Sequence, residues 1–154
     1  MTAEIRRIKE GEGETVATLW DEQARTEPDG APLPTRGLLN IRRMLDMAAW
    51  HERQLCLVAV DDEQIVGFVC ANIDAGSGLL PGLVGEIDGL YVTPVARGQG
   101  VSGRLAQSMV TQLRGRDAGT IRCLVCIENA DAQAFWQAQG FECDMVCMSL
   151  YRNR

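Results

Sequence analysis

The sequence has only one histidine, few aromatic residues and no long apolar run. The single His51 ends a helix-like stretch, where an imidazole commonly meets the last carbonyl groups, so we expect capping there and no histidine-based catalysis. No stretch approaches the roughly 18 consecutive apolar residues that a membrane span requires. The N-terminal stretch MTAEIRRIKEGEGE is too charged for a signal peptide. We therefore expect a soluble, cytoplasmic protein with no membrane partner.

Clustered basic residues are also missing. The 15 Lys and Arg residues are outnumbered by 21 Asp and Glu residues, which gives a net charge of −6, and they are scattered along the chain. Because a nucleic-acid-binding protein neutralises phosphates with clustered Lys and Arg, we expect no nucleic-acid partner. No Gly-Lys-Ser/Thr triplet follows the glycine-rich stretches, which excludes a P-loop. The charge balance favours a cationic or neutral partner.

The six cysteines include one C-x-x-C pair, Cys123 and Cys126, at a common metal-binding spacing. The pair lies in the strand-like stretch IRCLVCI, and residues three apart on a strand point to opposite faces. We therefore expect no metal site. We interpret this pair, together with Cys143 and Cys147, as buried thiols of a protein in a reducing compartment.

Apolar residues make up 46% of the 154-residue chain, which is enough for one core, and we predict one domain over residues 1–154. Apolar spacing and turn residues indicate its elements. We predict helices at residues 13–25, 36–52, 101–113 and 129–139, and strands at residues 54–60, 64–73, 83–92, 120–127 and 145–151.

A glycine-rich loop separates the strand at residues 83–92 from the helix that follows it. Gly98, Gly100 and Gly103 spell G-x-G-x-x-G, the fingerprint of dinucleotide-binding folds. In such folds the first glycine follows its strand almost at once, whereas here five residues intervene after Val92. The strand also contains two acids, while a central parallel strand is nearly all apolar. The pattern therefore disfavours dinucleotide binding.

The order of elements and two motifs resemble the GCN5-related N-acetyltransferase (GNAT) family over nearly the whole chain. The family's acyl-CoA loop, Gln/Arg-x-x-Gly-x-Gly/Ala, matches residues 97–102 except at Ser102. The later motif consists of Asn129, Ala132, Phe135, Trp136, Gly140 and Phe141. The resemblance implies a GNAT-like α/β fold with a mixed, mostly antiparallel central sheet flanked by helices.

The resemblance also implies acetyl-CoA as the cosubstrate. Glycines between a strand and a helix let backbone N–H groups approach a pyrophosphate, and the helix N-terminus adds a partial positive charge. Arg97 adds a full charge beside it. We expect the cosubstrate to contact two residues of the preceding strand, the loop and the later motif: Leu90, Val92, Arg97, Gly98, Gln99, Gly100, Val101, Ser102, Gly103, Asn129, Phe135 and Trp136.

For chemistry, the resemblance implies direct attack by an amine on an acyl group polarised by the backbone N–H of Val92. Alternation places Glu86 and Asp88 on one strand face, so either is a candidate general base, and we favour Glu86. The alternative for each of the two acids is a solvent-facing side chain with no catalytic role. Trp136 replaces the family's proton-donating tyrosine, which leaves Tyr91 and Tyr151 as the phenols able to substitute.

The resemblance implies a small-molecule primary amine as the acceptor. Four acids near the end of the first helix suggest a cationic, polyamine-like or aminoglycoside-like amine, although a solvated acidic face on an acidic protein is the explanation we favour: Asp21, Glu22, Glu27 and Asp29. Because Ser102 and Trp136 depart from the motifs, the alternative is a catalytically silent acyl-CoA-binding regulatory module. The sequence leaves a homodimer open.

Overall fold

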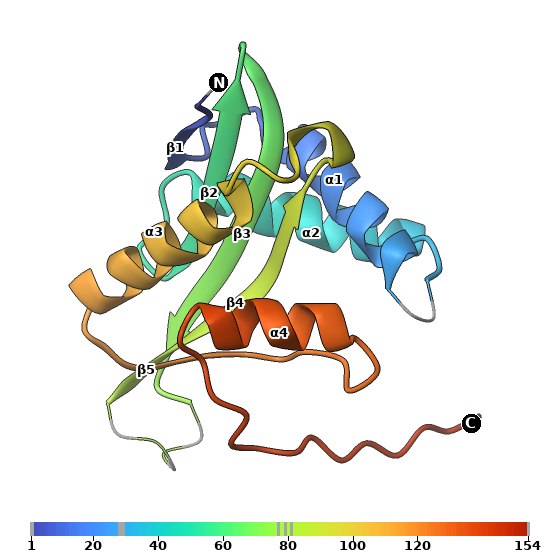
Figure 1. Ribbon diagram of the computed structural model, residues 1–154, viewed down its shortest axis with the longest axis vertical. Coiled ribbons are helices and arrows are strands. Elements are labelled where there is room, and N and C mark those ends of the chain that lie inside the picture. The colour runs from blue at the N-terminus through green and yellow to red at the C-terminus, as the bar shows by residue number, and fades with distance from the viewer. Residues whose placement is uncertain (1, 28–29, 77, 79, 81, 154) are drawn as a thin grey trace.

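The computed structural model describes residues 2–27, 30–76, 78, 80 and 82–153 and contains one five-stranded sheet (Figure 1). The strands lie side by side in chain order: β1 (Glu4–Arg7), β2 (Gln54–Asp61), β3 (Gln64–Asp74), β4 (Leu83–Val92) and β5 (Ala118–Cys123). Neighbouring strands are antiparallel except for β4 and β5, which are parallel. The predicted mixed, mostly antiparallel sheet is therefore confirmed.

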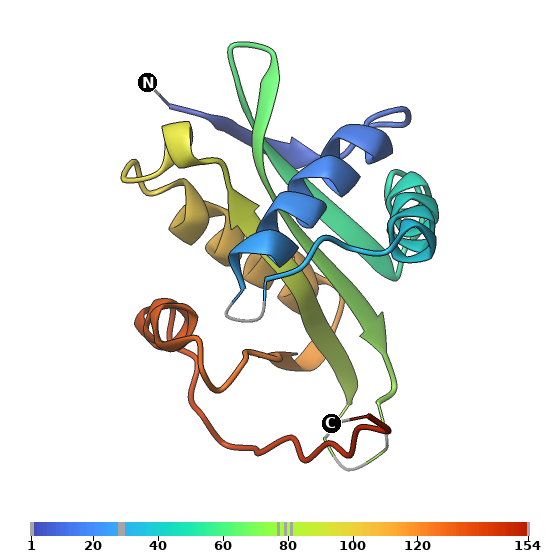
Figure 2. The ribbon, with the colours of Figure 1, turned by 90° about the vertical axis from the view of Figure 1, so that its right-hand side faces the viewer.

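Within the described residues, the sheet is surrounded by four α-helices and one short 3-10 helix: α1 (Gly13–Thr26), α2 (Thr35–Ala48), η1 (Pro94–Ala96), α3 (Val101–Gly115) and α4 (Ala130–Ala138). Figure 2 shows α1 and α2 on one side of the sheet and α3 on the other. All four predicted helices are present, with bounds that differ by a few residues. No helix in the described part of the chain is both long and apolar enough to cross a membrane.

Each face of the sheet has its own hydrophobic core. On the α3 face, Leu105, Met109 and Leu113 are fully buried, as the spacing of apolar residues in this helix predicts. On the α1–α2 face, Phe68 of β3 lies at the centre of the second core and stacks on Trp20 at 5.2 Å between ring centroids. Because both faces are covered, β2 and β3 are apolar along nearly their whole length, although they are antiparallel.

A β-bulge in β4 changes the direction of its side chains. Cys70 of β3 pairs with Gly89, but the next residue, Ala71, pairs with Ile87, so Asp88 is an extra residue with no partner in the register. Before the bulge Ile87 packs into the α3 core, whereas Tyr91, four residues later, packs into the α1–α2 core. Without the bulge the two side chains would lie on the same face.

Strand β5 follows β4 for only part of its length. The pairing runs from Leu83 with Ala118 to Ile87 with Cys123, and there it ends. The predicted strand at residues 120–127 is therefore shorter than expected, because Leu124 and Ile127 leave the sheet and are 72% and 86% exposed.

Three expectations from the sequence are corrected by the structure. The predicted strand at residues 145–151 is wrong, because this segment has no strand beside it and its apolar side chains are exposed. Cys126, Cys143 and Cys147 are exposed, so the prediction of buried thiols is wrong for them, and Cys123 is only half-buried. Strand β1 was not expected, because its four residues include two arginines and show no strand-like pattern in the sequence. It is a strand because it pairs with β2.

The core assignment predicts a large effect of truncating Leu105, which has no exposed surface. We expect Leu105→Ala to lower the free energy of unfolding by about 2–5 kcal/mol, because it removes buried methyl groups and leaves a cavity. Urea denaturation followed by circular dichroism measures the change. The control, Val95→Ala, alters a side chain that is 84% exposed and should change the free energy by less than about 0.5 kcal/mol. Equal effects of the two substitutions would contradict the packing described here.

Candidate active site

A cleft with a volume of about 380 Å³ opens where β5 leaves β4. One wall is the second half of β4, and the other is formed by the residues after β5 and by α4. The last turn of α1 and the first turn of α3 add further lining residues. The lining residues are Gln23, Thr26, Glu27, Ile87, Asp88, Gly89, Leu90, Tyr91, Val92, Arg97, Ser102, Cys123, Leu124, Val125, Cys126, Asn129, Asp131, Ala132, Phe135 and Trp136.

The backbone of β4 offers free hydrogen-bonding groups to this cleft. Thr93 donates its N–H to the carbonyl of Val66 on β3, at 2.8 Å. Successive N–H groups of an extended chain point to opposite edges, so the N–H of Val92 points away from β3 and toward the cleft. From Asp88 to Val92, no strand in the described part of the chain lies along this edge.

Two side chains donate hydrogen bonds to backbone carbonyl groups on the same edge of β4. Gln23 of α1 donates from Nε2 to the Leu90 carbonyl at 2.9 Å, and Arg97 donates from Nε to the Val92 carbonyl at 3.1 Å. The Arg97 guanidinium also lies 5.5 Å from the centroid of the Tyr91 ring, within the range of a cation–π contact. These contacts fix Arg97 at the α3 end of the cleft.

The loop between η1 and α3 has the geometry of an anion cradle. Gly98 and Gly100 have φ angles of 78° and 75°, which other residues rarely adopt, and a Cβ on either would meet no atom within 4 Å. Gly100 begins α3 without a side-chain cap, so the first N–H groups of the helix are left for another acceptor. Buried Val101 anchors the turn, and Ser102 lines the cleft.

Of the predicted loop residues, only Arg97 and Ser102 line the cleft; Gly98, Gln99, Gly100, Val101 and Gly103 do not. Gln99 is exposed on the loop, and Gly103 lies one residue beyond Ser102, where an added Cβ would come within 3.6 Å of the Gln139 side chain.

The two candidate bases differ in their surroundings. Glu86 accepts a hydrogen bond at Oε2 from Nε of Arg122, at 3.2 Å, and does not line the cleft. Asp88 does line it, and Nδ2 of Asn72 donates to its Oδ2 at 2.9 Å. The Asp88 side chain is exposed at the cleft, but desolvation by the surrounding protein raises its pKa; the hydrogen bond from Asn72 opposes this, and the nearby charge of Glu86 adds to it. The bulge therefore brings Asp88, rather than Glu86, to the cleft.

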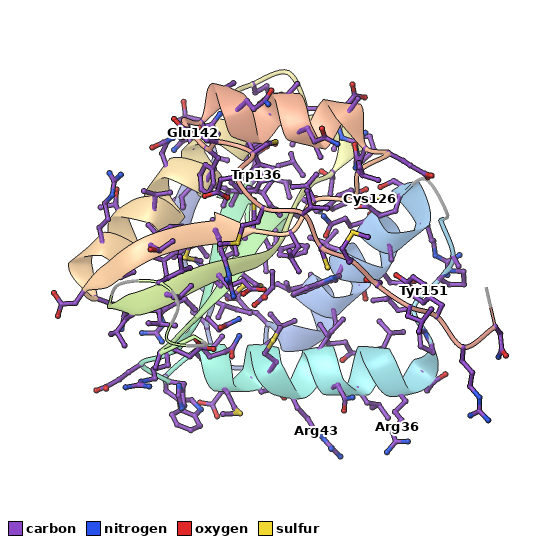
Figure 3. All side chains as sticks on the ribbon, turned by 90° about the horizontal axis from the view of Figure 1, so that it is seen from below. Arg36, Arg43, Cys126, Trp136, Glu142 and Tyr151 are labelled. Carbon is purple, nitrogen blue, oxygen red and sulfur yellow. The ribbon has the colours of Figure 1, made fainter. Side chains whose placement is uncertain are left out.

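Tyr91 is the tyrosine that lines the cleft. Its hydroxyl donates a long hydrogen bond to Oε2 of Glu22, at 3.4 Å. Burial and the charge of Glu22 raise the pKa of Tyr91, so the phenol keeps its proton near neutral pH. Tyr151, the other phenol considered from the sequence, lies near the end of the C-terminal segment, away from Trp136 (Figure 3).

Helix α4 supplies three of the predicted residues. Asn129 caps the helix by accepting at Oδ1 the N–H of Ala132, at 3.0 Å, and donates from Nδ2 to Oε2 of Glu27, at 3.3 Å, which bridges the cleft to the residue that follows α1. Trp136 lies between α4 and the sheet (Figure 3) and makes edge contacts with Phe135 and Phe141, each at 5.0 Å between ring centroids. Its environment is that of a packing residue.

The four acids that the sequence analysis grouped together do not form one cluster, because those in the described residues contact different groups. Asp21 pairs with Arg25 and accepts the N–H of Leu33, which together lower its pKa, so it organises the chain around α1. Glu27 lines the cleft, and Glu22 contacts the buried tyrosine. Asp29 lies outside the described residues.

Some lining residues were not expected from the sequence. Gln23 and Thr26 belong to the last turn of α1 and line the cleft, whereas the sequence pointed only to the acidic residues beside them. Cys123 also lines the cleft, and burial raises its pKa to about 11, so its thiol is not ionised at neutral pH. Among the described residues, no group of three His, Cys, Asp or Glu side chains is arranged to hold a metal ion.

Solved structures share this fold at low sequence identity. A transcriptional regulator from Bacillus halodurans C-125 matches with a TM-score of 0.79 and 19% identity, over 97% of this chain and 99% of that one. The aminoglycoside N-acetyltransferase AAC(6')-Iy matches in its complex with CoA, with a TM-score of 0.76 and 22% identity over 99% and 95% of the two chains. Its complex with the bisubstrate analogue CoA-S-monomethyl-acetylneamine gives 0.77 and 22% over 100% and 99%.

These likenesses concern the fold, and a search of curated proteins finds no match to the sequence. The family is identified by the sequence itself. The model of the acetyltransferase (GNAT) family matches residues 16–141, which include the helices of one face, the bulged β4, the glycine loop and α4. The chain therefore belongs to the GNAT acetyltransferase family.

Proposed function

We propose that the protein is an acetyl-CoA-dependent N-acetyltransferase that transfers the acetyl group to a primary amine of a small cationic molecule by direct attack. The unpaired edge of β4 supports this most strongly, because it presents backbone N–H groups to a cleft that has an uncapped helix N-terminus at one end and acids at the other. Such an arrangement suits an anionic acyl carrier and a basic acceptor.

The α3 end of the cleft suits the phosphates of acetyl-CoA. Positive φ angles at Gly98 and Gly100 turn the backbone so that N–H groups of the loop and of Ser102 reach an anion, and Arg97 adds a charge. Gln99, Val101 and Gly103 shape the loop. Leu90 and Val92 would hold the pantetheine arm along β4, opposite Asn129, Phe135 and Trp136.

Acetyl-CoA supplies a thioester whose carbonyl carbon the amine attacks and whose thiolate departs. The N–H of Val92 donates to the acyl oxygen and stabilises the negative charge that develops there. Asp88 accepts the proton that the attacking amine loses, directly or through a water molecule. Tyr91 of the same strand lines the cleft and keeps its proton near neutral pH, and exchanging its long hydrogen bond to Glu22 for one to the departing sulfur would make it the proton donor. No covalent bond to the enzyme forms.

We assign the base to Asp88 in preference to Glu86, which the sequence favoured. Glu86 is engaged by Arg122 and does not line the cleft. Asp88 has a raised pKa and lines the cleft. Its proton affinity is therefore closer to that of an efficient base near neutral pH.

The charges of the cleft support a cationic acceptor. Glu27, Asp88 and Asp131 line it, against a single lining cation, Arg97, and Arg97 lies at the end assigned to the cosubstrate. The structurally similar aminoglycoside N-acetyltransferase is solved with an acetylneamine-based bisubstrate analogue. An acceptor with several amino groups, of the aminoglycoside or polyamine class, fits this distribution.

The deciding experiment measures release of CoA thiol from acetyl-CoA with a panel of aminoglycosides, polyamines and neutral amines. Turnover with an amine supports the proposal. Binding of acetyl-CoA without release for any amine would favour a catalytically silent acyl-CoA-binding module, the alternative suggested by Ser102 and Trp136.

For cosubstrate binding, we expect Arg97→Ala and Gly100→Val each to weaken acetyl-CoA affinity by on the order of tenfold or more. The first removes a charge, and the second forces a branched side chain into a φ of 75°. Titration calorimetry measures the dissociation constant. The control, Gly115→Val, makes the same change at the other end of α3, where φ is not positive, and should leave affinity unchanged. Unchanged affinity in both test variants would refute the cosubstrate site.

For the base, we expect Asp88→Asn to lower kcat by on the order of 10²-fold or more while acetyl-CoA affinity stays the same. Because the raised pKa of Asp88 sets the acid limb of the pH–rate profile, that limb should lie above the usual aspartate pKa of about 3.9 and disappear in the variant. Glu86→Gln is the comparison and should keep the limb. If Glu86→Gln loses it and Asp88→Asn does not, the two roles are exchanged.

For the acceptor, we expect KM for a polycationic amine to rise as ionic strength increases from low to physiological values, since the Debye length falls to about 8 Å. Glu27→Gln should flatten this dependence, because Glu27 lines the cleft. Glu10→Gln is the control, an exposed acid that precedes α1 and so lies beyond the far end of that helix from the cleft. If the KM of the best acceptor does not change with ionic strength, the acids of the cleft do not attract the acceptor electrostatically.

A further inference from the structure

A second pocket, with a volume of about 400 Å³, is lined by residues of β1, β2 and the second half of α3. Its volume is within the range of pockets that hold small molecules. It shares no lining residue with the active-site cleft. Ser102 lines the cleft and Gln112 lines this pocket, and ten residues of α-helix separate them by about 15 Å. The two sites are therefore distinct.

Two arginines of this pocket lie close enough to repel each other. Burial lowers the pKa of the Arg7 guanidinium, and the positive charge of Arg116 lowers it further, although both groups stay charged at neutral pH. A third lining arginine, Arg6, is neutralised by Glu12, with 2.8 Å between Nη2 and Oε2. Among the described residues that line the pocket, none is acidic. Arg7 and Arg116 therefore form a local excess of positive charge in a protein whose net charge is −6.

Backbone carbonyl groups use only part of the hydrogen-bonding capacity of these two arginines. Arg7 donates from Nε to the carbonyl of Ala48 at 2.9 Å and from Nη2 to that of His51 at 2.6 Å. Arg116 donates from Nη1 to the carbonyl of Glu52 at 3.0 Å. These bonds hold the end of α2 and the loop after it, which is a structural role.

That role does not account for Nε of Arg116. This atom is buried, and it has no acceptor in the part of the chain that the structure describes. A buried donor on a charged group costs free energy when it is left without an acceptor, so such atoms are rare in proteins. An anion bound in the pocket would supply the acceptor.

The rest of the pocket is partly polar and partly apolar. Ser108 of α3 is half-buried, and its hydroxyl makes no hydrogen bond to another described residue, so it is available as a donor. The strands contribute Ile5, Leu55 and Leu57, which belong to the core on the α3 face. A ligand that suits all of these groups has an anionic end and an apolar body.

We propose that this pocket is a second ligand site, which binds a small organic carboxylate. The carboxylate oxygens accept hydrogen bonds from Nε of Arg116 and from the guanidinium N–H groups of Arg7 that the carbonyls leave over. The hydrocarbon body of the ligand packs on the apolar side chains of β1 and β2. The proposal does not depend on the reaction that the cleft performs.

A bound carboxylate would also stabilise the fold. Arg7 belongs to β1, Arg116 follows α3, and both hold the loop between α2 and β2. A ligand that bridges the two guanidinium groups offsets their repulsion, and a ligand that binds only the folded protein raises its melting temperature. This gives a measurement that needs no enzymatic activity.

The test is a titration of the full chain with sodium hexanoate, followed by amide chemical shifts at constant ionic strength. We expect signals of residues 5–7, 55–57 and 108–116 to shift with a dissociation constant on the order of 1 mM or below, and the melting temperature to rise. Acetate and inorganic phosphate should bind about tenfold more weakly or less, because neither covers the apolar side chains.

Two variants probe the two halves of the site. Arg116→Gln should weaken hexanoate binding by on the order of tenfold or more, because it removes a charge-assisted hydrogen bond. The matched control is Arg114→Gln, which removes the same charge from an exposed residue of α3 outside the pocket and should keep the wild-type affinity. Ser108→Leu fills the pocket without altering either arginine and should prevent binding, so the test does not rest on a variant that loosens the end of α2.

A further variant separates this pocket from the cleft. Arg97→Ala removes the lining cation of the cleft and should bind hexanoate as the wild type does. Loss of binding in Arg97→Ala would assign the carboxylate to the cleft and overturn the proposal. It is also overturned if hexanoate shifts no signal in residues 108–116, or if Arg116→Gln and Ser108→Leu bind it as tightly as the wild type. Equal affinities for phosphate and hexanoate would refute the carboxylate with an apolar body.

Discussion

The separation of β5 from β4 is the constraint on which the site depends. Two parallel strands that stayed paired would consume every N–H and C=O group between them, and no ligand could reach the backbone of β4. Here pairing ends at Ile87 and Cys123, so the following residues of β4 keep their edge open. Side chains of Gln23 and Arg97 satisfy the carbonyls of that edge, which leaves the N–H groups as donors for a bound molecule.

The bulge at Asp88 determines which side chains reach the open edge. By adding one residue it reverses the alternation of β4, so that Tyr91 enters the α1–α2 core and Val92 the α3 core. It also leaves Asp88 on the wall of the cleft, while Glu86 stays with Arg122. One extra backbone residue thus separates two carboxylates that look equivalent in the sequence.

The two ends of the cleft have opposite electrostatic character. At the α3 end, the uncapped helix terminus and Arg97 are positive, and at the α1 end Glu27 and Asp88 are negative. In the function proposed above, this division would serve an anionic cosubstrate at one end and a cationic acceptor at the other, although the protein as a whole has a net charge of −6. Asn129, bonded to Glu27, holds the two walls of the cleft together.

The sequence alone determined the four helices, the strands β2 to β5 and the glycine loop, because apolar periodicity, helix-stop glycines and the R-G-x-G spacing are local signals. The mixed sheet followed from the resemblance to the GNAT family. The sequence did not determine that β1 is a strand or that residues 145–151 are not one. A strand exists only where another strand pairs with it, and pairing is a tertiary property. The sequence also favoured Glu86 over Asp88 as the base, whereas the tertiary structure reverses the order in which the two approach the cleft, since only Asp88 lines it. That order depends on the register between β3 and β4 and on Arg122 of β5, which are fixed only when distant strands meet.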